Sequence, residues 1–108
     1  MSDFDNTLFK RNVGVLWPQV KYLVERGLPI YIITYRAEDQ RQFIENTLNQ
    51  TELHILGIGF CGSRKKDPKT KFTLVSHLQQ RYNIVEALDD DYEAVLQYKS
   101  LGIKAHLA

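Results

Sequence analysis

Four short apolar runs along the chain have the length and composition of buried β-strands. Leu28–Thr34 (LPIYIIT) is almost continuously apolar and rich in β-branched residues, which is typical of a strand covered on both faces. Three further runs share this character: Leu53–Phe60, Asn83–Leu88 and Ile103–Leu107. Two glycines weaken the run that ends at Phe60, and the last run is short enough for an edge strand.

Longer amphipathic segments lie between these runs and predict helices. There are four such segments, and each has an apolar stripe. The first begins near Pro18 and ends at Gly27, with Val20, Leu23 and Val24 in its stripe, and the second spans Ala37–Leu48, with Phe43, Ile44 and Leu48. The third starts at Asp67-Pro68, with Phe72, Val75 and Leu78, and the fourth spans Asp91–Leu101 and stops at Gly102, with Val95, Leu96 and Tyr98. Strands that alternate with helices predict a three-layer α/β fold, in which helices cover both faces of a parallel sheet.

Composition narrows the class of protein. The 108 residues suit a single domain, 1–108, and the 44% hydrophobic and 25% charged residues exclude disordered, collagen-like and coiled-coil proteins. The net charge of +1 gives no global field that would favour nucleic acid or a membrane as partner. One cysteine, Cys61, cannot form an internal disulfide, so we expect a reducing, cytoplasmic location. No apolar run approaches the ~18 residues that span a bilayer, so we expect no membrane partner.

Polar residues gather where the predicted strands end, which is where parallel sheets bind ligands. Asp3 and Asp5 stand at i and i+2, so an extended backbone places them on one side. Thr34 ends the first apolar run, and Asp89 and Asp90 follow the third. A carboxylate can attack phosphorus, a second can transfer protons, and carboxylate oxygens hold Mg²⁺. A hydroxyl and a lysine complete a phosphoryl cradle, so the pattern favours phosphoryl transfer.

Four motifs resemble those of one enzyme superfamily, in that superfamily's order. Asp3-Phe4-Asp5-Asn6-Thr7-Leu8 resembles the DxDxT signature of the haloacid dehalogenase (HAD) phosphohydrolases. IITYR resembles the second motif of the superfamily, Lys71 ahead of Phe72 and Leu74 resembles the third, and LDDDYEAV resembles the fourth. KKDPKTKF and ALDDDYEAVLQYKSLGI are most similar to the phosphatase domain of polynucleotide kinase-phosphatases. The resemblance covers nearly the whole chain and implies a Rossmann-like, HAD-like fold.

The resemblance implies a role for each matched residue. Asp3 would be the nucleophile and Asp5 the general acid and base, Thr34 would bind the phosphoryl group, and Lys71, chosen over Lys66 and Lys69 by spacing, would neutralise its charge. The implied Mg²⁺ ligands are Asp3, the backbone carbonyl of Asp5, Asp89 and Asp90. The implied substrate-binding residues are Asn6, which tolerates unusual backbone angles, Thr7 and Arg36. The implied substrate is a phosphorylated small molecule or a nucleic-acid end, such as a nucleotide or a polynucleotide 3′-phosphate.

The chain departs from the superfamily in two places. Only Met1 and Ser2 precede Asp3, where relatives have four or five apolar residues, so we expect a truncated first strand. A late, internal start, a very short strand, or a second chain that fills the gap by strand swapping or as a homodimer would each account for this. The segments Leu8–Leu16 and Thr34–Ala37 are too short for a lid, so we expect no cap domain and an open site.

Other interpretations stay open. The pair Asp3 and Asp5 taken alone also fits an acidic N-terminal tail, and the basic run Arg64-Lys65-Lys66 fits a solvated loop better than a nucleic-acid patch. A catalytically silent HAD-like binding or assembly module would carry the same fold. A phospho-accepting signalling domain uses the same residue types, but in the order acidic pair, Asp, hydroxyl and lysine, which this chain does not follow.

Overall fold

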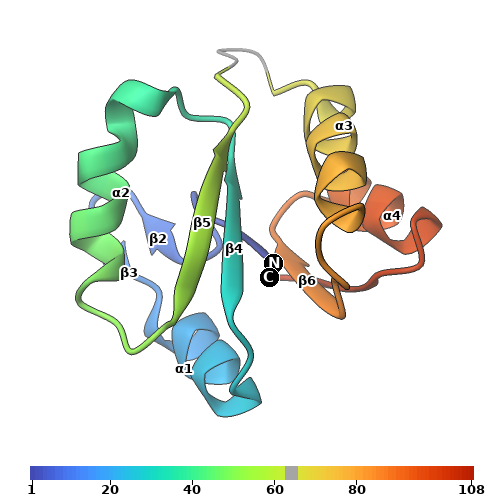
Figure 1. Ribbon diagram of the computed structural model, residues 1–108. Coiled ribbons are helices and arrows are strands. Elements are labelled where there is room, and N and C mark those ends of the chain that lie inside the picture. The colour runs from blue at the N-terminus through green and yellow to red at the C-terminus, as the bar shows by residue number, and fades with distance from the viewer. Residues whose placement is uncertain (63–65) are drawn as a thin grey trace.

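A five-stranded parallel sheet forms the centre of the computed structural model, which describes residues 1–62 and 66–108 (Figure 1). Its strands are β1 (Ser2–Asp3), β4 (Ile30–Thr34), β5 (Ile55–Phe60), β6 (Glu86–Asp89) and β7 (Lys104–Leu107), in the spatial order β5-β4-β1-β6-β7. The helices are α1 (Trp17–Arg26), α2 (Arg41–Leu48), α3 (Pro68–Gln79) and α4 (Tyr92–Ser100). Arg64 and Lys65 of the basic run lie outside the described residues.

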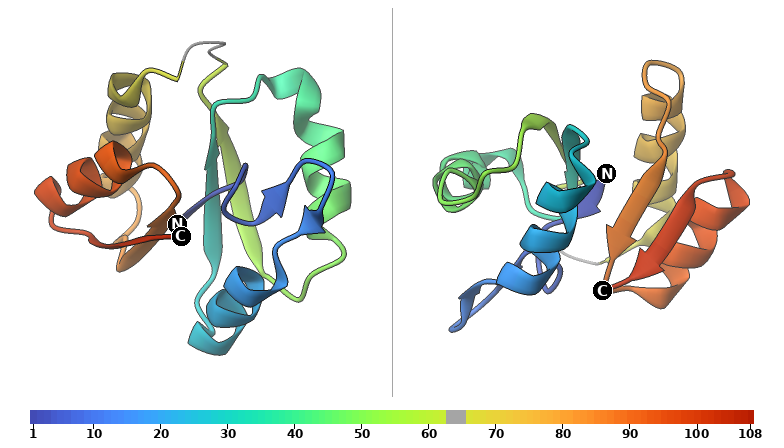
Figure 2. Two further views of the ribbon diagram at one scale, coloured as in Figure 1. Left: turned by 180° about the vertical axis from the view of Figure 1, so that it is seen from behind. Right: turned by 90° about the horizontal axis from the view of Figure 1, so that it is seen from below.

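Helices cover both faces of the sheet, as Figures 1 and 2 show. On one face, Ile32 of β4 and Leu88 of β6 pack in a cluster with residues of α1 and α2. On the other face, Ile33 and Ala87 pack in a cluster with residues of α3 and α4. Adjacent residues of a strand point to opposite faces, so the apolar runs of β4 and β6 supply both cores. The predicted three-layer α/β architecture is therefore confirmed.

The predicted helix boundaries are confirmed where a capping residue marks them. Gly27 has φ 68° and its N–H donates to the Val24 carbonyl at 3.0 Å, which ends α1. Asp67 and Asp91 precede α3 and α4, and each side chain accepts a backbone N–H two residues on, at 3.0 Å. These two caps fix the helices that face β6.

Two apolar positions, Phe43 and Leu96, and one segment differ from the prediction. Leu96 was expected to point inward but is 47% exposed, because Ala94, Val95 and Tyr98 already fill the buried face of α4. The predicted helix over Ala37–Leu48 begins as a short 3-10 turn, η1 (Glu38–Gln40), and becomes α-helical only at Arg41.

A small antiparallel hairpin follows β1 and has no counterpart in the predicted elements. It pairs β2 (Phe9–Lys10) with β3 (Gly14–Val15). Asn12 at φ 68° and Gly14 at φ 99° make the turn, in a backbone region that asparagine and glycine tolerate best. Among the described residues, only this hairpin lies between β1 and α1 and only η1 lies between β4 and α2, so neither segment carries an inserted cap domain.

The first strand has two residues, as expected, yet it holds the central place in the sheet. Ser2 lies opposite both Ile32 and Leu88, and Asp3 lies opposite Ile33. The Leu88 N–H donates to the Met1 carbonyl at 3.1 Å, which extends the pairing by one residue. The two neighbouring strands therefore fix the position of Asp3.

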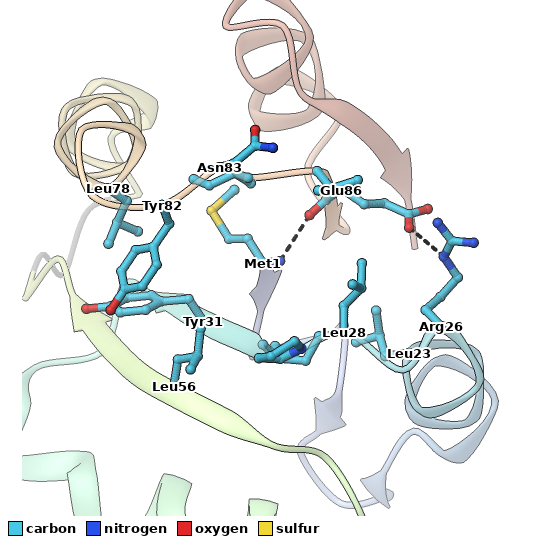
Figure 3. A pocket seen from close by; sticks show the side chains of 14 residues that line it. Met1, Leu23, Arg26, Leu28, Tyr31, Leu56, Leu78, Tyr82, Asn83 and Glu86 are labelled. Atoms are coloured by element: carbon cyan, nitrogen blue, oxygen red, sulfur yellow. Dashed lines mark hydrogen bonds and ion pairs between the residues drawn. The ribbon is translucent and has the colours of Figure 1, made fainter.

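A mainly apolar cavity of about 190 Å³ lies at the amino ends of the strands. Figure 3 shows Tyr31, Leu56 and Tyr82 on one side of it, Leu28 on the other, and Met1 between them. This cavity is at the opposite end of the sheet from the predicted site. Within residues 1–62 and 66–108, no helix has the length and apolar character needed to cross a membrane.

Candidate active site at the carboxyl ends of the strands

Three neighbouring strands end in polar residues that are almost fully buried. Asp3, Thr34 and Asp89 are the last residues of β1, β4 and β6, and their exposed fractions are 7%, 0% and 0%. Because these strands are adjacent and parallel, their last residues meet at one edge of the sheet. The structure therefore brings together three of the residues that the motifs predicted.

Lys71 reaches this edge from α3 and pairs with two carboxylates. Its Nζ donates to Asp3 Oδ1 and to Asp89 Oδ2, each at 2.9 Å, and the residue is 1% exposed. The ammonium also lies 4.6 Å from the centre of the Tyr35 ring. Burial alone would lower the pKa of Lys71, but the two carboxylates together raise it above the ordinary value of a lysine. The predicted choice of Lys71 is consistent with this geometry.

Three carboxylates gather at this edge of the sheet, and two of them pair with Lys71. Asp3, Asp89 and Asp90 each offer an oxygen, and the three oxygens lie within 4.8 Å of one another. Burial raises the pKa of Asp3 well above its ordinary value, the Lys71 ammonium opposes this, and the nearby charge of Asp89 adds to it. The cluster is short of positive charge and consists of hard oxygen donors. These residues fit a hard divalent cation.

The Asp5 carboxylate belongs to a different cluster. Arg36 donates to it through both arms of the guanidinium, Nε to Oδ2 at 2.9 Å and Nη2 to Oδ1 at 2.8 Å. The guanidinium also lies 5.0–5.9 Å from the ring centres of three phenylalanines: Phe4, Phe9 and Phe43. Phe43 is 41% exposed, and it packs on this arginine and edge to face with the rings of Phe4 and Phe9, at the border of the core. The structure therefore places the Asp5 side chain with Arg36 and not with the three clustered aspartates.

The remaining predicted residues shape the turns that leave the strands. Asn6 has φ 58°, a conformation that few residues other than asparagine and glycine tolerate, and the turn there brings Thr7 back over β1. The Thr7 hydroxyl donates to Asp3 Oδ2 at 3.3 Å and lies 3.5 Å from Asp90 Oδ1. The Thr34 hydroxyl accepts the Arg36 N–H at 3.1 Å, which holds it at the end of β4.

Two tyrosines of the site were not predicted as functional residues. Tyr98 of α4 donates its hydroxyl to Asp89 Oδ2 at 2.7 Å, although the sequence indicated only that Tyr98 is buried. Tyr35 covers Lys71, and burial raises the pKa of its hydroxyl to about 12. The only signal in the sequence is position: Tyr35 follows the hydroxyl motif, and Tyr98 lies in the helix after the acidic pair.

A further buried carboxylate, Glu86, lies at the amino end of β6, on the sheet face opposite to that of Asp89. It accepts hydrogen bonds from Tyr22 at 2.5 Å and Arg26 at 2.8 Å, and its Oε2 lies 2.6 Å from His106 Nε2. Burial alone would raise the pKa of Glu86, but these partners lower it to about 2. The cluster joins α1, β6 and β7, so it stabilises the fold away from the candidate site.

Comparison with protein-family models and with curated proteins finds no match for this chain. The resemblance to the HAD phosphohydrolases therefore depends on the four motifs. What the structure adds is the arrangement of their residues: a buried nucleophile candidate, a lysine beside it and an acidic cluster around it.

Proposed function

We propose that the protein is a Mg²⁺-dependent phosphomonoester hydrolase of the HAD type, acting through an aspartyl-phosphate on Asp3. The observation that carries this proposal is the surroundings of Asp3. Its carboxylate ends the central strand, lies 2.9 Å from the Lys71 ammonium and shares an acidic cluster with Asp89 and Asp90. A buried carboxylate with a fixed cation beside it is suited to attack an anionic phosphate, because the cation offsets the repulsion.

The reaction follows from the groups present. An Asp3 oxygen forms a bond to phosphorus while the bond from phosphorus to the ester oxygen breaks, and the leaving oxygen takes a proton. Asp5 is the carboxyl group that would supply this proton and later accept one from the attacking water. In the structure Arg36 occupies both Asp5 oxygens, so Arg36 must turn toward a phosphoryl oxygen before Asp5 can act.

The other residues bind and orient the phosphoryl group. Lys71 and the Thr34 hydroxyl would contact its oxygens from two sides. Asp3, Asp89, Asp90 and the Asp5 backbone carbonyl would hold Mg²⁺, which neutralises phosphate charge when bound. Thr7 keeps Asp3 in place by donating to the oxygen that Lys71 does not contact.

The lack of an inserted cap domain in the described residues favours a substrate with more than one phosphate or an extended chain. Arg36 is 26% exposed on its side chain and presents a guanidinium at the edge of the site, which suits a second phosphate. A nucleotide or a polynucleotide 3′-phosphate end has this character. The chain has a net charge of only +1, so its recognition of phosphate would be local.

Hydrolysis of an aryl phosphate with and without Mg²⁺ tests the proposal. Asp3→Asn should abolish Mg²⁺-dependent turnover while circular dichroism shows an intact fold. Asp39→Asn is the matched control, because Asp39 is an exposed residue of η1 outside the site. Near-normal turnover by Asp3→Asn would overturn the assignment of the nucleophile.

A further inference from the structure

Tyr98 is a buried tyrosine of α4, and its hydroxyl contacts the candidate site. It is 1% exposed, and its hydroxyl donates to Asp89 Oδ2 at 2.7 Å. The same oxygen accepts from Lys71 Nζ at 2.9 Å. Its ring packs in the core cluster with Val75 and Val95, so the hydroxyl is held where it is.

The hydrogen bonds to Asp89 leave its carboxylate little freedom. An ionised carboxylate has about four acceptor positions, two on each oxygen. Tyr98 and Lys71 both donate to Oδ2, and the Asp91 N–H donates to Oδ1 at 3.0 Å. These donors come from α3, α4 and the turn after β6, so together they fix the plane of the carboxylate. Within residues 1–62 and 66–108, no second donor reaches Oδ1, so one acceptor position on that oxygen is open to a cation.

We propose that Tyr98 is a positioning residue, whose hydroxyl holds Asp89 in the one orientation that serves both Lys71 and a bound Mg²⁺. The inference rests on the proposed function and deepens it, because it assigns a role to a residue outside the four motifs. Without the hydroxyl, Lys71 is the one remaining donor to Oδ2 among the described residues, and the ammonium can draw the carboxylate toward itself against the single Asp91 N–H on Oδ1. The carboxylate then leaves the orientation in which one of its oxygens lies within 4.8 Å of an oxygen of Asp3 and of Asp90.

The test replaces Tyr98 by phenylalanine, which keeps the ring and removes the hydroxyl. Changes in residues that orient a metal ligand typically weaken metal binding or activity about 10- to 100-fold. We expect Mg²⁺ affinity, measured by titration calorimetry on the whole chain, to fall about 10-fold or more. With an aryl phosphate at saturating Mg²⁺, kcat should fall while KM changes little, because Tyr98 does not reach the substrate.

Tyr22→Phe is the matched control, since Tyr22 also donates its hydroxyl to a buried carboxylate, Glu86, at the other end of the sheet. It should lose stability in the same way but keep the Mg²⁺ affinity of the natural chain. An unchanged affinity in Tyr98→Phe, or an equal loss in Tyr22→Phe, would overturn the inference. If Tyr98→Phe unfolds, the variant and the unsubstituted chain are both titrated in sucrose, which favours the folded state.

The design separates this inference from the proposed function. Calorimetry measures Mg²⁺ binding whether or not the chain hydrolyses phosphate. Turnover that survives Asp3→Asn would reject the proposed function and leave the calorimetric result for Tyr98 standing. Loss of turnover in Asp3→Asn together with normal Mg²⁺ affinity in Tyr98→Phe would reject the positioning role alone.

Discussion

Replacing Lys71 by methionine should leave two buried carboxylates facing one another without the cation that they share. Asp3 is 7% exposed and Asp89 fully buried, and each lies 2.9 Å from Lys71 Nζ. Removing one partner from a buried ion pair costs about 3–5 kcal/mol, because the remaining charge stays buried without compensation. The free energy of unfolding of a small domain is about 5–15 kcal/mol, so this one change should remove a large part of it.

The penalty in Lys71→Met should depend on pH, because it exists only while the carboxylates are ionised. Without the ammonium, burial holds the pKa of Asp3 in the folded chain above the unfolded value of about 3.9. Between the unfolded pKa and the higher folded pKa, the folded chain binds more protons than the unfolded chain. The stability of Lys71→Met therefore falls as pH rises above about 4. Urea unfolding followed by circular dichroism measures the free energy of unfolding at pH 4 and at pH 7.5. Lys69→Met, an exposed position of the same helix, should change stability by about 0.5 kcal/mol or less.

Two results would refute this reasoning. A loss below about 1 kcal/mol at pH 7.5 would mean that the Lys71 charge does not balance the two aspartates, since even an exposed pair contributes up to about that much. An equal loss at pH 4 and pH 7.5 would mean that the methylene packing of Lys71, and not its charge, supports the site.

Three further predictions concern the arginine, the distal carboxylate and the metal. Arg36→Lys keeps the positive charge but loses the two-armed contact with Asp5. We expect kcat/KM for an aryl phosphate to fall at least about 10-fold, which corresponds to the loss of one charged hydrogen bond. An unchanged kcat/KM would exclude Arg36 from the site. Glu86 has a pKa lowered from 4.5 to about 2, so it stabilises the fold above pH 4.5, and this contribution, on the order of 2 kcal/mol, is lost as pH falls toward 2. Urea unfolding at pH 5 and pH 3 should show a smaller difference in Glu86→Gln than in the natural chain, and equal differences would contradict this. Excess EDTA should abolish hydrolysis and Mg²⁺ restore it, whereas full activity in EDTA would refute the metal site.

The sheet could be predicted from the sequence wherever an apolar run is long enough to be buried on both faces. Ile30–Thr34 lies within the predicted run Leu28–Thr34, and the strand starts later because Pro29 has no N–H to donate. The hairpin of β2 and β3 could not be predicted in this way, since two-residue strands show no period. Asn12 and Gly14 were its only signal, and they indicate a turn without indicating a pair of strands.

The candidate site divides along similar lines. Motif order and strand ends predicted that Asp3, Thr34, Lys71 and Asp89 lie together, because the ends of adjacent parallel strands must meet. The pairing of Asp5 with Arg36, residues 31 apart in the chain, depends on how the first turn leaves the sheet, and spacing carries no information on that. The polar contacts of residues that the pattern predicts as buried cannot be predicted either, because a buried position indicates packing and does not indicate which group a hydroxyl contacts.

The central claim is that Asp3 carries the phosphoryl group during turnover. The most direct measurement mixes the Mg²⁺-loaded chain with an aryl phosphate, quenches in acid and reduces the mixture with borohydride, which converts an acyl phosphate on aspartate into homoserine. Mass spectrometry should find homoserine at position 3 and nowhere else. Asp5→Asn should increase its amount, because attack of water on the intermediate needs that carboxylate. Homoserine at another aspartate, or steady turnover with Asp3 unmodified in both chains, would contradict the account.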